Sequence, residues 1–469
     1  MHLILEQALT DGQLILSDAK RAFEKNDIER ALAILDVLDG IMPRMHALNY
    51  RSELLWRPVR MALGPKPFPS IDGEKRPTPP WGLILTVGKG IHFQVAIRRL
   101  LAQTRELRSD CLIKKALRAL ETLEPSGAEP HWQSAMRFSP LAEPLLDAGK
   151  RHGFMPASGI MLEIGPVWRL PLERGVCSLV PFGEGLLIAT RRKNNRGLLL
   201  DVALDQVSPC GELLPVKLDR PVDLRPLPGG VSPMFSIARH PNSRELIFPE
   251  FCADNAIRLM AYDIFHSTRR VFSETMEPAM AGPFYVCSSN SRVWLVSRFS
   301  GGVTEFLPNG SILLRMEPPE GMLSPLRVEA FGETKRVVMC AHPRNTRRKY
   351  ERFLGHTRNT LSDLWCWDVA RDDVTAIELP DEYVSAPRFV TTVQGYWVIV
   401  TETFLHVLDE SLRPCISLNL AAHLCRMFGL PYHADKVFSI ACCQDGRTLY
   451  FAEYMVTGAV GSLQFNFAQ

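Results

Sequence analysis

The sequence has few of the features that mark membrane-spanning or secreted proteins. Its 469 residues contain no apolar run approaching the roughly 18 residues that a membrane-spanning helix needs. The first ten residues carry Glu6 and no basic cluster, which does not fit a secretory leader peptide. We therefore expect no membrane span, and the composition favours a cytoplasmic protein.

Cysteine pairs and metal-binding spacings are also lacking. The 11 cysteines are scattered, and none belongs to a Cys-x-x-Cys pair. Only Cys442 and Cys443 are adjacent, and neighbours on a strand point to opposite faces. No histidine pair has His-Glu-x-x-His spacing, and no Gly-x-Ser-x-Gly elbow is present. We predict reduced, mostly buried thiols, with no metal or other cofactor and no catalytic residue that a motif identifies.

What the sequence does contain is enough apolar material for two or three domains. Apolar residues make up 46% of the chain and charged residues 22%, which allows sizeable cores. The pattern divides the chain into two regions. Residues 1–155 are predicted to form a mainly α-helical module, and residues 160–469 are predicted to be all β structure.

The first region begins with a predicted pair of helices. Leu9, Leu16 and Phe23 recur every seven residues, which is typical of an amphipathic helix. Asn26 is a candidate N-cap of the second helix, because Glu29 follows it at the spacing of a capping box. The second helix is expected to bury a stripe formed by Ala31, Leu35 and Leu38.

This helix pair resembles a single tetratricopeptide repeat near residues 12–45. Ala19, Ala31 and Pro43 stand at twelve-residue intervals, where that family keeps Ala, Ala and Pro, and Asn26 occupies its turn position. The resemblance implies a protein-binding helical surface.

A proline-rich break separates the helix pair from the rest of the helical module. Residues 64–80 contain six prolines, which predicts a linker or an irregular surface segment. Gly82–Val87 has the composition of a strand, and Gly88–Gly90 is then expected to form a tight turn before a helix over about 92–123. Another helix is predicted after Pro140.

From about residue 160 the sequence consists of short apolar runs separated by turn residues. Four runs open after a small residue and a proline, and a turn follows about eight residues later, with a second apolar run behind it. The four prolines are Pro233, Pro283, Pro325 and Pro387. Two further units lack the proline and run from Cys177 to Thr190 and from Val437 to Glu453.

The spacing of these six units predicts a β-propeller. The units begin near residues 177, 233, 283, 325, 387 and 437, intervals that fit four-stranded blades. The last unit is one strand short, and Met161–Leu172 could supply that strand and close the ring. Six blades are predicted, with seven as the alternative count and a pair of β-sandwiches as the alternative fold.

The units resemble the β-propeller superfamily as a whole rather than one named family. Trp367-Asp368 matches the dipeptide of WD40 blades, but it occurs once and no Gly-His pair precedes the blades. The resemblance is therefore not clearly to WD40 proteins. Trp294, Trp365, Trp367 and Trp397 fall within strand runs and are expected to pack between blades.

Two loops of the predicted propeller are strongly basic. Both connect the second and third strands of their units, so they are expected on one face, where they could bind an acidic protein surface or another anion. The predicted binding residues are Arg191, Arg192, Lys193, Arg196, Arg344, Arg347, Arg348 and Lys349. Residues 159–469 hold 32 basic and 33 acidic side chains, which makes nucleic acid an improbable but open partner.

Other polar residues leave an enzymatic alternative open. Glu250, Asp254, Glu402 and Glu453 lie at or near the ends of second strands, and paired carboxylates there would suit a carbohydrate hydrolase or lyase. His240, His342, His356 and His433 could gather on propeller loops.

The sequence favours a non-enzymatic scaffold or adaptor. In that hypothesis the helical module binds one protein partner and a propeller face binds another. A carbohydrate-cleaving propeller is the first alternative, and a nucleic-acid-associated scaffold is the second.

Overall fold

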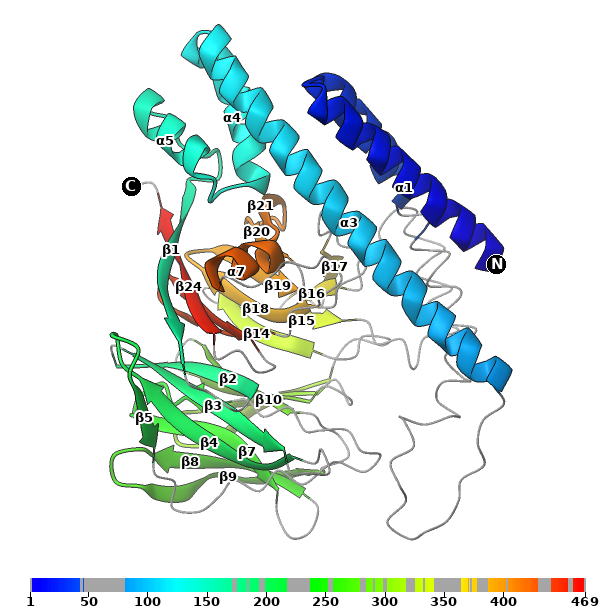
Figure 1. Ribbon diagram of the computed structural model, residues 1–469. Coiled ribbons are helices and arrows are strands. Elements are labelled where there is room, and N and C mark those ends of the chain that lie inside the picture. The colour runs from blue at the N-terminus through cyan, green and yellow to red at the C-terminus, as the bar shows by residue number, and fades with distance from the viewer. Residues whose placement is uncertain are drawn as a thin grey trace. The chain divides into compact units, whose positions relative to one another are not determined.

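A computed structural model gives the backbone of most of the chain (Figure 1). The structure describes residues 2–42, 45, 81–170, 175–183, 185–193, 199–216, 237–251, 256–278, 284–289, 292–297, 302–317, 325–331, 334–340, 364–369, 371, 373–377, 387–401, 404–428, 440–453 and 459–467. The predicted proline-rich break at 64–80 lies outside these residues. Two compact units are present: a helical unit that ends at Phe154 and a β unit that begins at Met155.

The helical unit contains α1 (His2–Glu24), a helix over residues 28–42, α3 (Trp81–Thr122), α4 (Pro125–Phe138) and α5 (Glu143–His152). No helix in the described residues is long and apolar enough to cross a membrane.

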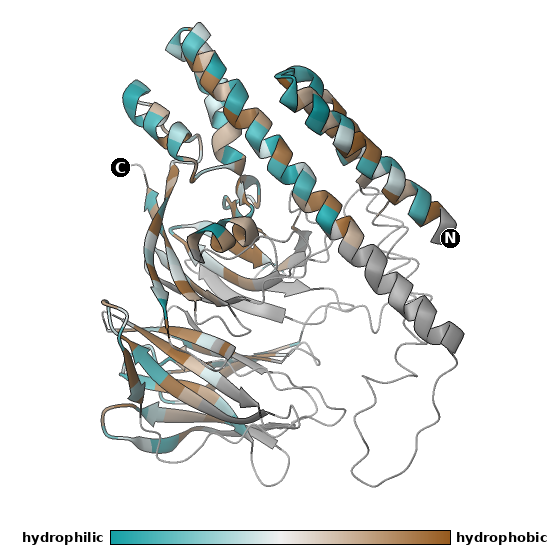
Figure 2. Cartoon of the chain, in the orientation of Figure 1, coloured by the Kyte–Doolittle hydropathy of each residue, from teal (hydrophilic) through white to brown (hydrophobic). Residues whose placement is uncertain are grey.

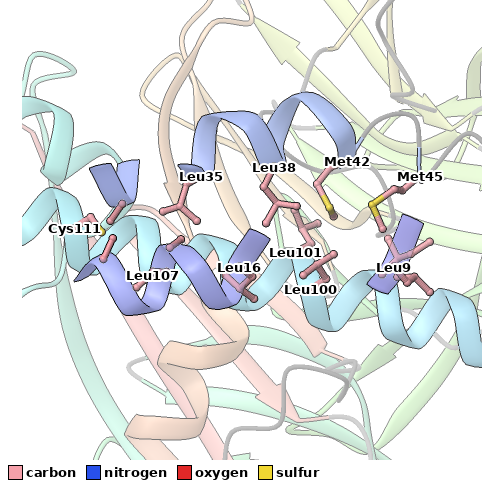
Figure 3. Packing of buried hydrophobic residues seen from close by; sticks show 14 of the residues in the cluster. Leu9, Leu16, Leu35, Leu38, Met42, Met45, Leu100, Leu101, Leu107 and Cys111 are labelled. Atoms are coloured by element: carbon pink, nitrogen blue, oxygen red, sulfur yellow. The ribbon is translucent and has the colours of Figure 1, made fainter. Parts of the chain in front are cut away.

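The core of the helical unit lies where α1, the helix over residues 28–42 and α3 meet (Figure 3). As the heptad spacing predicts, Leu9 and Leu16 are buried and Phe23 packs against the same cluster. The stripe of Ala31, Leu35 and Leu38 is fully buried. From α3 come Leu100, Leu101, Leu107 and Cys111. In Figure 2, brown hydrophobic patches alternate with teal hydrophilic patches along α1 and α3.

Ion pairs fix α3 against the helix over residues 28–42. The Arg108 guanidinium lies 2.9 Å from an Asp36 oxygen and 2.6 Å from an Asp39 oxygen, and Lys115 reaches Glu29 at 2.8 Å. Arg108 is largely buried, so its two carboxylate partners offset the cost of removing its charge from water.

The predicted N-cap at Asn26 is wrong by one residue. Asn26 has a φ of 64°, the left-handed conformation that ends a helix, and its N–H donates to the Phe23 carbonyl. Asp27 caps the next helix instead, because its carboxylate accepts the Arg30 N–H at 3.2 Å. Asn tolerates the left-handed region better than most residues, so it fits the turn between two helices.

The predicted strand at Gly82–Val87 and the tight turn at Gly88–Gly90 are also wrong. Both segments belong to α3, which continues through them to Thr122. A short apolar run between glycines does not distinguish a strand from part of a helix, because its periodicity fits both. The helix after Pro140 is confirmed as α5, and α4 precedes it.

The β unit consists of six four-stranded antiparallel sheets among the described residues. The first three sheets are β2 (Gly175–Phe182), β3 (Gly185–Lys193), β4 (Leu199–Val207) and β5 (Leu213–Val216); β6 (Ala238–Arg239), β7 (Glu245–Phe251), β8 (Ala256–Asp263) and β9 (Thr268–Pro278); and β10 (Phe284–Ser289), β11 (Arg292–Ser297), β12 (Val303–Phe306) and β13 (Ile312–Met316).

The remaining three sheets follow the same order along the chain except at its end. They are β14 (Pro325–Phe331), β15 (Thr334–Cys340), β16 (Leu364–Asp368) and β17 (Asp373–Ala376); β18 (Pro387–Val393), β19 (Tyr396–Thr401), β20 (Leu405–Leu408) and β21 (Pro414–Leu418); and β22 (Ile440–Asp445), β23 (Thr448–Glu453), β24 (Ala459–Phe467) and β1 (Ile160–Arg169). In this last sheet β1 pairs antiparallel with β24, so that Ile160 lies opposite Phe467.

The first strands of successive sheets contact one another in the order β2, β6, β10, β14, β18 and β22, and β22 contacts β2. This arrangement is a β-propeller, as the repeat spacing predicts. The first strands line the inside of the ring, and the fourth strands form its outer edges. Pro325 and Pro387 open β14 and β18 as predicted, whereas Pro233 and Pro283 lie outside the described residues.

Antiparallel connectivity gives the propeller two different ends. We call one the hairpin end: it carries the turns from first to second strands and from third to fourth strands, such as residues 240–244, 264–267 and 307–311. We call the other the link end: second and fourth strands end there, and first and third strands begin there.

The last link between sheets includes a short buried helix, α7 (Leu420–Phe428). It contacts β1 and β24, and all its residues from Leu420 to Cys425 are buried. Among them is His423, and its burial, with Arg426 nearby, lowers the pKa of the imidazole from 6.5 to about 4.

We predict that His423 makes the protein less stable in mild acid. The unfolded chain takes up the proton near pH 6.5 and the folded chain only near pH 4, so stability falls across this interval as the pH falls. The loss attributable to His423 reaches about 3 kcal/mol at pH 4. Urea unfolding of wild-type protein and His423→Gln between pH 8 and pH 4 measures it. Equal slopes against pH in the two proteins would contradict the prediction.

Candidate functional site

Only part of the predicted basic site can be placed. Arg191, Arg192 and Lys193 form the end of β3, where Arg191 lies opposite Val202 of β4. The other predicted binding residues, Arg196, Arg344, Arg347, Arg348 and Lys349, lie outside the described residues. The strand order nevertheless gives both basic segments the same topological position. In chain order, each follows the second strand of its sheet, β3 in one case and β15 in the other.

The one predicted acid whose side chain is described, Glu250, is part of a buried ion pair. Its carboxylate accepts a hydrogen bond from Arg269, and the side chains are only 9% and 3% exposed. The Arg269 guanidinium also lies over the Phe248 ring, 5.6 Å from its centroid. Glu250 therefore links β7 to β9 within one sheet. The Asp254 and Glu402 residues and the Glu453 side chain lie outside the described residues.

His240 joins two neighbouring sheets at the hairpin end. Its Nδ1 accepts the Asn242 N–H at 3.1 Å, and its Nε2 lies 2.8 Å from the Pro308 carbonyl oxygen. Because a carbonyl only accepts, Nε2 carries the proton, and the ring is the neutral Nε2–H tautomer. His240 thus has a structural position in the turn. His342, His356 and His433 lie outside the described residues.

The same pair of sheets is held together by tight packing of a turn. Gly310, in the turn between β12 and β13, has a φ of 85°, and a side chain there would clash with the Phe272 carbonyl. The Phe272 ring meets both His240 and Phe306 edge-on. Phe272 and Phe306 belong to one apolar layer between these two sheets.

An exposed ion pair borders this layer. Arg270 donates two parallel hydrogen bonds to the Glu245 carboxylate, at 2.7 and 2.6 Å, and Ser243 donates a third at 3.1 Å. The Arg270 hydrogen bonds lower the pKa of Glu245 and raise that of Arg270. Glu245 is therefore a fully engaged carboxylate.

The turn between β8 and β9 is also organised by a carboxylate. Asp263 accepts the N–H groups of Phe265 and His266 at 2.9 and 3.1 Å, and its second oxygen lies 2.8 Å from His266 Nδ1. The hydrogen bond from His266 lowers the pKa of Asp263. These bonds fix the backbone of the turn and hold the Phe265 side chain outward.

Sequence reasoning missed a patch at the hairpin end that is formed by Phe182, Arg244 and Phe265, which we call the aromatic–arginine patch. The Phe265 ring lies 5.9 Å from the Phe182 ring, and the Arg244 guanidinium lies over Phe265, 5.3 Å from its centroid. Phe182 is buried between sheets, whereas Phe265 is 60% exposed. The signal in the sequence was an aromatic residue in the short segment Asp263–Ser267.

Packing between blades is confirmed for Trp397, which belongs to an apolar cluster that includes Cys366 of the neighbouring sheet. Trp294 and Trp367 are buried, and the Trp365 side chain lies outside the described residues. In the described part of the chain, no group of three or more His, Cys, Asp or Glu is arranged to hold a metal ion. Five cysteines are described as free thiols: Cys111, Cys210, Cys366, Cys415 and Cys425.

Comparison with known proteins gives no family for this chain. No protein-family model matches the sequence, and no curated protein matches it significantly.

Solved structures that are similar include a streptogramin B lyase, with a TM-score of 0.37 and 8% identity over 66% of this chain and 98% of that one. The Pan2 WD40 domain of Neurospora crassa has a TM-score of 0.36 and 10% identity over 66% of this chain and 97% of that chain. A glutaminyl cyclase from Myxococcus xanthus has a TM-score of 0.34 and 10% identity, again over 66% and 97%. At this similarity none of them bears on activity.

We predict that Glu250 stabilises the protein only together with Arg269. Glu250→Ala leaves the guanidinium buried without this partner, and we expect the free energy of unfolding to fall by about 3–5 kcal/mol. Replacing both residues, with Glu250→Leu and Arg269→Met, removes both charges and should recover most of the loss. Denaturant unfolding of the three proteins measures this. A double variant as unstable as Glu250→Ala would contradict the prediction.

Proposed function

We propose that this protein is a non-enzymatic scaffold that binds one protein through its helical unit and another through the link end of its propeller. The six described sheets are, in this proposal, the complete set of blades. The propeller supplies a rigid ring on which loops are displayed, and rigid scaffolds with variable loops are common binding surfaces. A reducing compartment such as the cytoplasm fits the free thiols.

The proposal is supported by two basic segments that each follow the second strand of a sheet in the chain. One continues from Arg191–Lys193 at the end of β3, and the other occupies residues 341–363 between β15 and β16. A connection of 23 residues is far longer than a turn between antiparallel strands requires. Positive charge gathered at one end favours a partner with an acidic surface.

The helical unit offers a second surface. Ile4 and Leu14 on α1 and Val37 on the neighbouring helix are exposed although the unit has a well-formed core. Exposed aliphatic side chains on a helix hairpin suit the binding of an apolar segment from another protein. This supports a separate binding role for the first unit.

We predict that charge reversal at the link end abolishes partner binding without unfolding the protein. The variant combines Arg191→Glu, Arg192→Glu, Arg347→Glu and Arg348→Glu, and recovery of the acidic partner should fall at least about tenfold because attraction becomes repulsion. The measurement is quantitative affinity purification of the full chain from its native host, together with the melting temperature. Unchanged recovery would refute the proposal.

The matched control reverses charge at the hairpin end, with Arg371→Glu and Arg413→Glu in two exposed turns. Partner recovery should be unchanged in this control. Nuclease treatment of the purified sample tests whether the partner is nucleic acid. If this treatment removes the bound material, the partner is nucleic acid and not an acidic protein.

A further inference from the structure

In the aromatic–arginine patch, the solvent-exposed side chain of Phe265 lies on an ordered turn. Phe265 is 60% exposed, but its turn is fixed by the Asp263 carboxylate and its ring contacts Phe182 from the neighbouring sheet. An exposed aromatic ring on an ordered turn loses little conformational entropy on binding, so it is well suited to be an anchor in an interface.

Arg244 gives the patch a positive charge that the described surroundings leave available. The two nearest acids of the same sheet are occupied: Glu245 is bonded to Arg270, and Asp263 is bonded to His266. No described carboxylate forms an ion pair with Arg244, whose guanidinium lies over the Phe265 ring. A carboxylate that reached Arg244 would therefore approach the edge of an exposed aromatic ring.

A further exposed apolar side chain lies on the outer strand of the adjacent sheet. Leu214 on β5 is 50% exposed and shares a strand face with Val216, which packs against the apolar layer between β2–β5 and β6–β9. That layer also contains Phe182. The face of β5 that points toward the sheet bearing Phe265 thus exposes a second large apolar side chain.

We propose that the aromatic–arginine patch binds a short segment of a partner protein in which an aromatic or aliphatic side chain lies next to an aspartate or glutamate. The apolar side chain packs on Phe265, and the carboxylate pairs with Arg244. Stacking and cation–π contact keep the guanidinium plane in place for bidentate recognition of the carboxylate.

Two other occupants fit the patch less well. Two copies of this chain meeting symmetrically at the patch would bring one Arg244 near the other, which is repulsive. Nucleic acid would need several cations to follow its phosphates, and the patch itself supplies one, Arg244.

The patch lies at the hairpin end, so its binding role does not depend on the basic segments at the link end.

The test begins with a library of random 12-residue peptides displayed on phage and selected on the full-length protein. We expect selection of sequences with Asp or Glu within two positions of Phe, Trp or Leu. A selected peptide is then synthesised with a fluorophore, and its affinity is measured by fluorescence anisotropy. Phe265→Ala and Arg244→Glu should each weaken binding at least about tenfold, as expected for central interface residues.

Matched variants separate the patch from general effects. Phe265→Tyr keeps the ring and should bind within about threefold of wild type, since the stacking surface is retained. Leu313→Ala, which truncates an exposed apolar side chain on β13, and Arg413→Glu, which reverses an exposed charge in another turn, should leave the affinity unchanged. The quadruple link-end variant should also bind the peptide normally.

Several results would overturn the proposal. The first is selection of peptides that lack the acidic–apolar pattern. The second is an equal peptide affinity in wild type and Phe265→Ala. The third is binding of a single-stranded oligonucleotide that Phe265→Ala abolishes. Concentration-dependent dimerisation that Phe265→Ala abolishes would assign the patch to a second copy instead. If Phe265→Ala lowers the melting temperature, the peptide affinities of Phe265→Tyr and Arg244→Glu still test the proposal. Normal binding by Phe265→Tyr and weak binding by Arg244→Glu are then expected, and equal affinities would overturn the proposal.

Discussion

Closure of the ring of sheets is the constraint on which the rest of this structure depends. Each sheet has two apolar faces, and in the closed ring each face is covered by a neighbouring sheet. The pairing of Ile160 with Phe467 joins segments from opposite ends of the β unit within one sheet. The Tyr396 hydroxyl adds to it by donating a hydrogen bond to the Ser158 carbonyl at 2.8 Å. The sheet that closes the ring is therefore formed by strands from both ends of the β unit.

Burial on two faces explains the short apolar runs of the sequence. In β19, every residue from Trp397 to Thr401 is buried, and β12 and β20 are buried along their whole length. Such strands show no alternation of polar and apolar residues, because both faces pack against neighbouring sheets. The outer strand β13 exposes Ile312, Leu313 and Leu314, since only the inner strands are enclosed on every side.

Repeat spacing and turn chemistry therefore made the propeller predictable, whereas local pattern alone failed in two places. Gly82–Val87 is too short and too uniformly apolar to distinguish strand from helix, and Asn26 serves the turn rather than the cap. At the candidate sites, charge runs such as Arg191–Lys193 are visible in the sequence. The aromatic–arginine patch is not, because Phe182 and Phe265 are 83 residues apart and only the packing of two sheets brings them together.

Phe182 and Phe265 differ in whether closure of the ring of sheets explains their positions. Phe182 fills the layer between two sheets, so its burial is explained by closure. Phe265 extends beyond that layer into water, and its exposed ring gains little of the stabilisation that burial gives an aromatic side chain. The hydrogen bonds of Asp263 nevertheless fix the turn that presents it. A residue that is held in place but contributes little to folding is better explained by what it contacts outside the chain.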